Sequence, residues 1–185
     1  MEKTVYNTGY IGEGIYKPSL NGKNTKVYQV WVDMLERCYH TPCQLRQPTY
    51  IGCTVVEEWH NFQNFAQWFT DNYIEKYQLD KDLLFSGNKV YSPLTCCFIP
   101  QEINLVIVKK LVKDLPAGIT LHQNKYRARV REFSKEVYLG SFNTIEEAFK
   151  AYKKAKETHL KVLANKYKLT ITEPCYVALC NYKIN

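Results

Sequence analysis

The sequence predicts an α+β protein built from two modules, and three observations support this. An alternating apolar and charged pattern around residue 126 gives way to a helical period after residue 144, as expected for a sheet packed on one helix. Aromatic residues recur at helical spacing over 57–73. Residues 1–112 carry 11 Lys and Arg against 11 Asp and Glu, whereas residues 113–185 carry 14 against 7. The whole net charge of +7 therefore lies in the second part.

The first module begins with two predicted helices. From Thr25 the apolar residues share one helical stripe, and the stripe over 57–73 is mostly aromatic, which is typical of a core rather than of a binding site. A largely polar connection spans 40–51, and a short strand is expected over 53–56. The two stripes consist of Val27, Trp31, Met34, Leu35 and Cys38, and of Trp59, Phe62, Phe65, Ala66 and Phe69.

The first module ends in a predicted strand, loop, strand and helix. The strands are expected over 79–84 and 96–99, and Gly87-Asn88 marks a turn between them. Pro100 fits the first turn of the following helix, which carries apolar residues as far as Leu111. The sequence therefore predicts a ββα unit.

The second module begins with a predicted hairpin and continues into a long helix. Tyr126, Ala128 and Val130 fall on one side of the first strand, and Arg127, Arg129 and Arg131 fall on the other. Val137 and Leu139 repeat the pattern in a second strand, with Glu136 and Tyr138 facing away. Residues 144–147, Thr-Ile-Glu-Glu, form a capping box that starts a helix reaching about residue 166. A strand-like run follows over 176–180.

Three arginines on neighbouring outward positions repel one another, and the fold gains nothing from them. A basic sheet face of this width fits the DNA major groove. The alternative interpretation is a solvated strand face, which is the usual fate of a run of charges.

The second module resembles the APETALA2-type DNA-binding domain over about 50 residues. The matching motif consists of Gly118-Ile119, Lys125-Tyr126-Arg127-Ala128-Arg129-Val130-Arg131, Val137-Tyr138-Leu139-Gly140-Ser141-Phe142, Thr144, Glu146-Glu147-Ala148 and Ala151-Tyr152. The resemblance implies that a three-stranded sheet enters the major groove of double-stranded DNA. Carried over by position, the DNA-contacting residues are Thr120, His122, Arg129, Arg131, Glu136 and Tyr138, and Lys125 and Arg127 are further DNA-binding candidates. Plant members carry arginine at positions 120, 122 and 136, so their sequence preference does not transfer.

The ββα unit resembles the HNH nuclease motif of phage proteins related to homing endonucleases. The resemblance implies a divalent metal, Mg²⁺ or Mn²⁺, held by Asp80 and Asn104 on the scissile phosphate. Lys81 stands where the family has its general-base histidine. A lysine at its usual pKa of about 10.4 is protonated at neutral pH and cannot accept a proton. Lys81 is better suited to hold a phosphate, and Asp82 is the remaining candidate to activate water.

These resemblances leave two functional hypotheses open. The first is a phage HNH-type, metal-dependent DNA endonuclease directed by the second module, with Asp80, Lys81, Asp82 and Asn104 as catalytic candidates. The second is a catalytically inactive DNA-binding or counter-defence protein, of the anti-restriction or anti-CRISPR kind, that inhibits a host nuclease complex. The expected domains are an HNH-like module over 1–112, an APETALA2-type domain over 113–168 and a tail over 169–185.

The spacing of the seven cysteines indicates whether zinc is bound, and the apolar runs of the sequence indicate the cellular compartment. The spacing of Cys38, Cys43, Cys53, Cys96 and Cys97 matches no zinc motif, so buried free thiols are expected rather than structural zinc. No run approaches the roughly 20 apolar residues of a membrane span. We therefore expect a protein of the cytoplasm, in a host cell if it is phage-encoded, with no membrane partner. The oligomeric state stays open.

Overall fold

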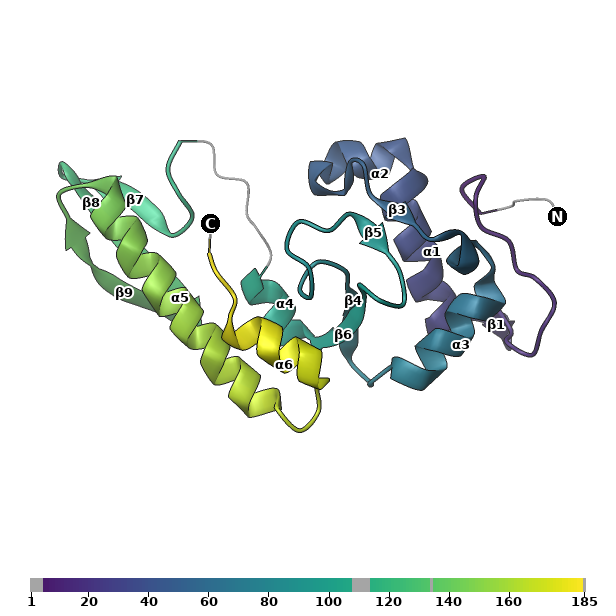
Figure 1. The fold of residues 1–185 in the computed structure, drawn as a ribbon. Helices are drawn as coiled ribbons and strands as arrows, with labels where there is room; N and C mark the ends of the chain where they lie inside the picture. The colour runs from purple at the N-terminus through teal and green to yellow at the C-terminus, as the bar shows by residue number, and fades with distance from the viewer. Residues whose placement is uncertain (1–4, 108–113, 134, 185) are drawn as a thin grey trace. The chain divides into compact units, whose positions relative to one another are not determined.

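In the computed structural model, residues 5–107, 114–133 and 135–184 are described, and they form a mixture of helices and short sheets, as an α+β fold requires (Figure 1). The chain divides into two compact units, 1–98 and 99–185, so the division falls earlier than the expected domain boundary at 112. Over the described ranges, no helix combines the length and the apolar character needed to cross a bilayer.

The core of the first unit lies between α1 (Lys26–Tyr39) and α3 (Phe62–Asn72). Both helices begin where the side chain of the preceding residue accepts a backbone N–H, from Tyr28 to Thr25 and from Gln63 to Asn61. The buried core residues include both predicted stripes except Val27, which packs against the core but is only partly buried: Trp31, Met34, Leu35, Cys38, Trp59, Phe62, Phe65, Ala66 and Phe69. The indole N–H of Trp31 donates to the carbonyl of Trp59 at 2.7 Å, which satisfies the one polar atom of this side chain in the core.

Two segments of the first unit differ from the prediction. The helix expected over 57–73 is a 3₁₀ turn, η2 (Glu57–His60), followed by α3, because Asn61 caps a new helix. The polar connection over 40–51 contains α2 (Thr41–Arg46) and η1 (Pro48–Tyr50). Each of these begins with proline at its first or second position, where the missing N–H costs nothing.

The N-terminal segment packs on the helices of the first unit instead of extending freely. The buried amide of Gln63 accepts the N–H of Tyr16 at 3.0 Å and donates to the Tyr16 carbonyl at 3.0 Å. A side chain at Gly9 would overlap Leu35 and Trp31 of α1. The segment ends in a small hairpin, β1 (Ser19–Leu20) with β2 (Lys23–Asn24).

Two small sheets complete the first unit and lead into the second. β3 (Thr54–Val55) pairs in parallel with β5 (Val90–Tyr91), and β4 (Tyr77–Asp80) pairs with β6 (Cys97–Pro100). The strand predicted over 79–84 is wrong beyond residue 80, because the Asp80 carboxylate accepts the N–H groups of Asp82 and Leu83 and turns the chain. α4 (Gln101–Ile107) follows β6, and the predicted continuation to residue 111 lies outside the described residues.

The second unit has two layers, a three-stranded antiparallel sheet and one long helix (Figure 1). The sheet has the order β7 (Ile119–His122), β8 (Lys125–Glu132) and β9 (Lys135–Phe142). α5 (Ile145–Tyr167) starts at Thr144 with the predicted capping box to Glu147. The buried residues between the layers are Ile119, Ala128, Val130, Ala148 and Tyr152.

The strand predicted over 176–180 is wrong, because this segment lies in a helix, α6 (Glu173–Cys180). Pro174 stands in its first turn, and Cys175 and Leu179, four residues apart, are its buried side chains. That spacing is helical, but the five apolar residues in a row over 176–180 also match a strand.

Gly118 holds the start of β7 against α5. Its φ is +77°, and a Cβ atom there would overlap the Tyr152 ring and the carbonyl oxygen of Arg129. That close approach accompanies a hydrogen bond from the N–H of Arg129 to the carbonyl of Gly118 at 2.8 Å. Only glycine satisfies both the conformation and the space.

Gly118→Ala is expected to lower the free energy of unfolding by about 3 kcal/mol, because left-handed strain of about 1–2 kcal/mol adds to overlap of about 1–3 kcal/mol. Gly52→Ala is the matched control, with φ +76° and open space around it, and only the strain applies there. Urea unfolding followed by circular dichroism measures both. An equal loss in the two variants would contradict the packing role of Gly118.

His159 is a buried titratable group in the second unit. It is 3% exposed, its Nε2 has no hydrogen-bond partner among the described residues, and its ring meets Phe133 edge-on at 4.7 Å between centroids. Burial lowers the pKa of His159, and Lys166 acts in the same direction, while the charges of Glu132 and Glu102 oppose the shift.

Acid should therefore destabilise this unit through His159. Below the usual histidine pKa of about 6.5, the unfolded chain binds a proton that the folded chain still excludes, so the free energy of unfolding falls as the pH falls. His159→Phe keeps a ring beside Phe133 and removes the titration. From pH 7 to 5.5 the wild-type chain should lose more stability than the variant, by at most about 1.4 kcal/mol per pH unit. Parallel pH profiles of the two proteins in urea unfolding would rule this out.

Candidate nucleic-acid interface

The strand register of β7, β8 and β9 brings the predicted DNA-binding residues onto one face. Residues directly opposite in an antiparallel pair point to the same side of the sheet. The opposed pairs are Thr120 with Arg127, His122 with Lys125, Arg127 with Ser141, Arg129 with Tyr138 and Arg131 with Glu136. We call these nine residues the outer face. All are exposed except Arg127, which is half-buried.

Ser141 belongs to the outer face, but the strict alternation of the sequence does not place it there. The register shifts between Ala128 and Arg129, so that Leu139 is an extra residue in β9. This β-bulge reverses the alternation beyond it and turns Ser141 outward, where its hydroxyl bonds that of Tyr138 at 2.7 Å. Gly140, at φ +135°, is the signal in the sequence, because glycine inside a strand often marks a bulge.

The charge of the outer face is mostly uncompensated. Arg129 donates to Glu136 at 2.8 Å, but both side chains are exposed, and such pairs contribute about 0–1 kcal/mol. In the described parts of the chain, Lys125, Arg127 and Arg131 form no ion pair. The face thus carries four cations and one carboxylate, and a polyanion can displace the weak Arg129–Glu136 pair at little cost.

The dimensions of the outer face suit the major groove. Three strands spaced about 4.8 Å apart span about 10 Å, and the groove is about 12 Å wide. Alternate residues of β8 lie about 6.8 Å apart, which equals about two base-pair steps of 3.4 Å. Arg127, Arg129 and Arg131 can therefore reach successive positions along a groove.

The predicted catalytic residues lie partly in the loop between β4 and β5. Asp80 ends β4, and its Oδ1 accepts the N–H of Asp82 at 3.1 Å and that of Leu83 at 2.7 Å. The pKa of Asp80 is raised to about 6, because burial disfavours the charged carboxylate and Asp82 adds a second negative charge. Asn104 lies on α4 in the second unit.

Lys81 is buried and holds this loop together. It is 6% exposed, and its Nζ donates to the carbonyl of Asn88 at 2.9 Å and lies 3.4 Å from Asp82 Oδ2. In return, the Asn88 amide donates to the Lys81 carbonyl at 2.6 Å and to the Val90 carbonyl at 2.7 Å. Asn88 was predicted only as a turn residue. These reciprocal hydrogen bonds between Lys81 and Asn88 stabilise the loop and keep the Lys81 ammonium group away from solvent.

These contacts already use part of the donor set that a divalent metal at the loop would need. One oxygen of Asp80 is occupied by backbone amides, and one oxygen of Asp82 lies beside the Lys81 ammonium group. Over the described ranges, no three Cys, His, Asp or Glu side chains are placed to bind a metal ion together. The seven cysteines are free thiols, and burial raises the pKa of Cys38 and of Cys96 to about 12, so both stay protonated at neutral pH.

Comparison of the chain with protein-family models, with curated proteins and with solved structures found no match.

Lys81→Met should lower the stability of the first unit by about 1–3 kcal/mol, because the Asn88 carbonyl loses its donor in a buried place. Lys89→Met is the control: Lys89 also donates to a carbonyl, that of Thr49 at 2.6 Å, but it is exposed and should cost under about 1 kcal/mol. Urea unfolding followed by tryptophan fluorescence reports on this unit, since Trp31, Trp59 and Trp68 all belong to it. Unchanged stability with weaker DNA binding would instead make Lys81 a phosphate contact.

Proposed function

We propose that the protein binds double-stranded DNA by placing the outer face of β7, β8 and β9 in the major groove. The observation that carries the proposal is the register, which gathers Lys125, Arg127, Arg129 and Arg131 on one exposed face. The opposite face is closed by α5, so the cations have no route into the fold. The expected APETALA2-type docking agrees with this arrangement.

The contacts of the outer face divide into two kinds. Arginine side chains reach guanine edges in the major groove, where one bidentate contact contributes about 1–3 kcal/mol of discrimination. Glu136 can accept the amino group of cytosine but would repel a phosphate. Thr120, Tyr138 and Ser141 supply hydroxyl groups for phosphates or base edges. The outer face thus has the groups for sequence-selective binding.

We propose binding without strand cleavage, the second of the two hypotheses from the sequence. The order β4, β6 and α4 is compatible with an HNH-type ββα unit. However, the residue at the general-base position, Lys81, is buried and bonded to Asn88, and this favours a scaffold over a nuclease. The counter-defence form of this hypothesis has a host nuclease complex as the partner. It is the form to test next if the purified protein binds no DNA duplex.

The binding proposal predicts that Arg131→Ala weakens binding to a DNA duplex selected from a random pool by about five- to hundredfold, the equivalent of about 1–3 kcal/mol. Arg46→Ala is the control, because Arg46 is an exposed arginine that lies in the first unit and outside the outer face. Fluorescence anisotropy at a fixed salt concentration measures both. Equal affinity of the two variants would remove the groove-docking proposal.

Cleavage is tested separately with supercoiled plasmid and Mg²⁺ or Mn²⁺. We expect no metal-dependent nicking by the wild-type chain. Nicking that Asp80→Ala abolishes would restore the endonuclease hypothesis and its metal at Asp80.

A further inference from the structure

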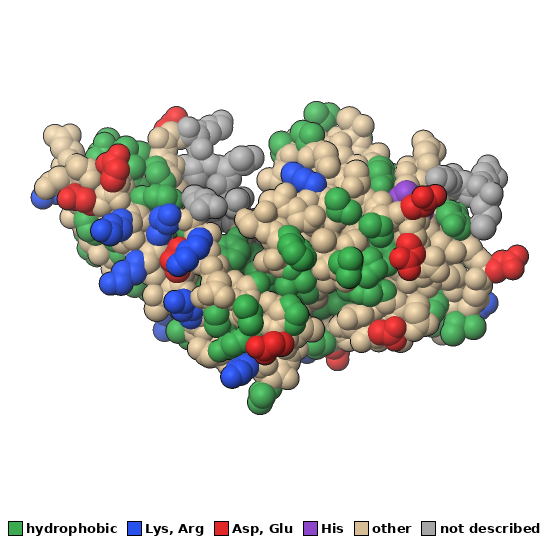
Figure 2. Space-filling view, in the orientation of Figure 1, with side chains coloured by type: hydrophobic (Ala, Val, Ile, Leu, Met, Phe, Trp, Pro, Cys, Tyr) green, Lys and Arg blue, Asp and Glu red, His purple; other side chains and the backbone are tan. Residues whose placement is uncertain are grey.

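A second basic surface runs along the side of α5 that faces away from the sheet. Lys153, Lys154 and Lys161 follow Lys150 by three, four and eleven residues. This spacing places all four lysines on one side of the helix. Ala148 and Tyr152, the buried residues of α5 that pack on the sheet, occupy the opposite side. We call the four lysines the α5 lysine face. Figure 2 shows Lys and Arg side chains gathered over α5.

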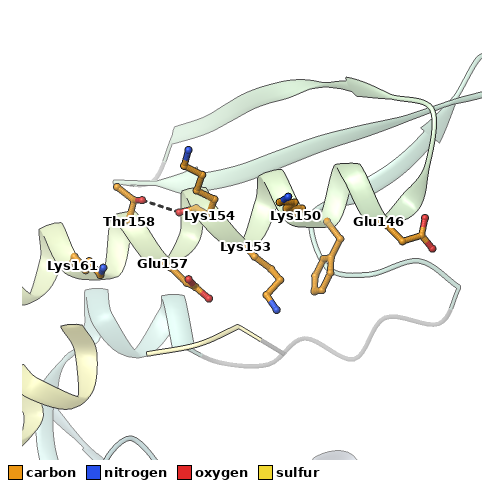
Figure 3. A pocket seen from close by; sticks show the side chains of 8 residues that line it. Glu146, Lys150, Lys153, Lys154, Glu157, Thr158 and Lys161 are labelled. Carbon is orange, nitrogen blue, oxygen red and sulfur yellow. Dashed lines mark hydrogen bonds between the residues drawn. The ribbon is translucent and has the colours of Figure 1, made fainter. Parts of the chain in front are cut away.

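The α5 lysine face is open to solvent. Its side chains, together with Glu146, Phe149, Glu157 and Thr158, line an open hollow of about 570 Å³ (Figure 3). Lys150, Lys154 and Lys161 are exposed, and Lys153 is half-buried with its ammonium group 5.7 Å from the centre of the Phe149 ring. None of the four forms an ion pair within the described part of the chain.

Two acidic residues line this hollow: Glu146, which is exposed four residues before Lys150, and Glu157, which already has partners in the fold. Glu157 lies 3.7 Å from the Lys183 ammonium group and accepts the N–H of Ile184 at 3.1 Å. Other basic residues of α5 are engaged elsewhere: Lys166 donates to Glu102 at 2.6 Å, and Lys156 donates to the Tyr152 hydroxyl at 3.2 Å. Among the residues that the structure describes, these four are therefore the lysines of α5 that form no ion pair and no hydrogen bond to a partner such as Glu102 or Tyr152.

Such a face gains nothing for the fold. Like charges three or four residues apart destabilise a helix by about 0.2–0.5 kcal/mol per pair. The row from Lys150 to Lys161 is about 16 Å long at 1.5 Å per residue. One strand of duplex DNA presents a phosphate about every 3.4 Å along the axis, so the row faces about five phosphates.

We propose that the α5 lysine face binds the phosphate backbone of a second DNA segment, so that the second unit bridges two duplexes. The bridging half of this inference rests on the proposed function. A duplex on the outer face lies on the far side of the sheet from α5, so the lysines meet a different segment. Lysine contacts to phosphate carry no base preference, and this second site accepts any sequence. Its strength falls steeply with salt.

The test is capture of one duplex by another through the full chain. A biotinylated duplex carrying the preferred sequence is fixed on beads and saturated with protein, and a fluorescent duplex of unrelated sequence is then added at about 50 mM salt. The wild-type chain should capture the second duplex. Replacing all four lysines by glutamine should leave retention on the first duplex within about twofold and reduce capture at least tenfold, as loss of several phosphate contacts requires.

A matched control replaces Lys17, Lys23, Lys26 and Lys76, four exposed lysines of the first unit, by glutamine and should preserve capture. Capture that persists in the α5 variant overturns the proposal, because a dimer with two outer faces would then explain it. Retention on the first duplex without any capture by the wild-type chain overturns it as well and leaves the proposed function standing. Failure to retain protein on the first duplex overturns both.

Discussion

The second unit depends on the sealing of one side of β8 by α5. Ala128 and Val130 are buried against Ala148 and Tyr152, and because strand side chains alternate, their neighbours must point outward. A slip of one residue would bury arginines and expose the apolar set, which would cost several kcal/mol for each unpaired charge. The register is therefore fixed by the core. The basic outer face follows from that core, and its charge is available to a partner without further rearrangement.

Much of this unit could be predicted from the sequence because its signals are local. Alternation over residues 126–131 and the capping box at Thr144 each depend on neighbours within a few positions, and both are present. The bulge at Leu139 was missed, although Gly140 hinted at it, because its position depends on which residue of β8 stands opposite. Ser141 is therefore assigned to the outer face from the strand register of the structure and not from the sequence. The strand prediction over 176–180 is wrong because five consecutive apolar residues fit either period.

The first unit shows where sequence reasoning reaches its limit. The sequence predicts a strand over 79–84, but the Asp80 side chain bonds the backbone ahead of it and ends the strand. The burial of Lys81 depends on a bond to Asn88, seven residues later, and on the core beneath it. No local sequence pattern predicts that a lysine is buried for a structural reason. The resemblance to a nuclease motif identifies position 81 as a candidate catalytic position, but it does not predict the direction in which the Lys81 side chain points.

The N-terminal segment has a consequence for how this chain can be dissected. Its content of Gly, Asn and Lys resembles that of a dispensable linker, yet Gln63 uses its whole amide group on the backbone of this segment, and Gly9 lies against two core side chains. A chain that began at α1 would lack the segment that covers Trp31, and the buried side-chain amide of Gln63 would lose its hydrogen-bond partners. A shortened chain designed by composition would therefore lose part of the first unit's packing, although the division between the two units lies much later, between residues 98 and 99.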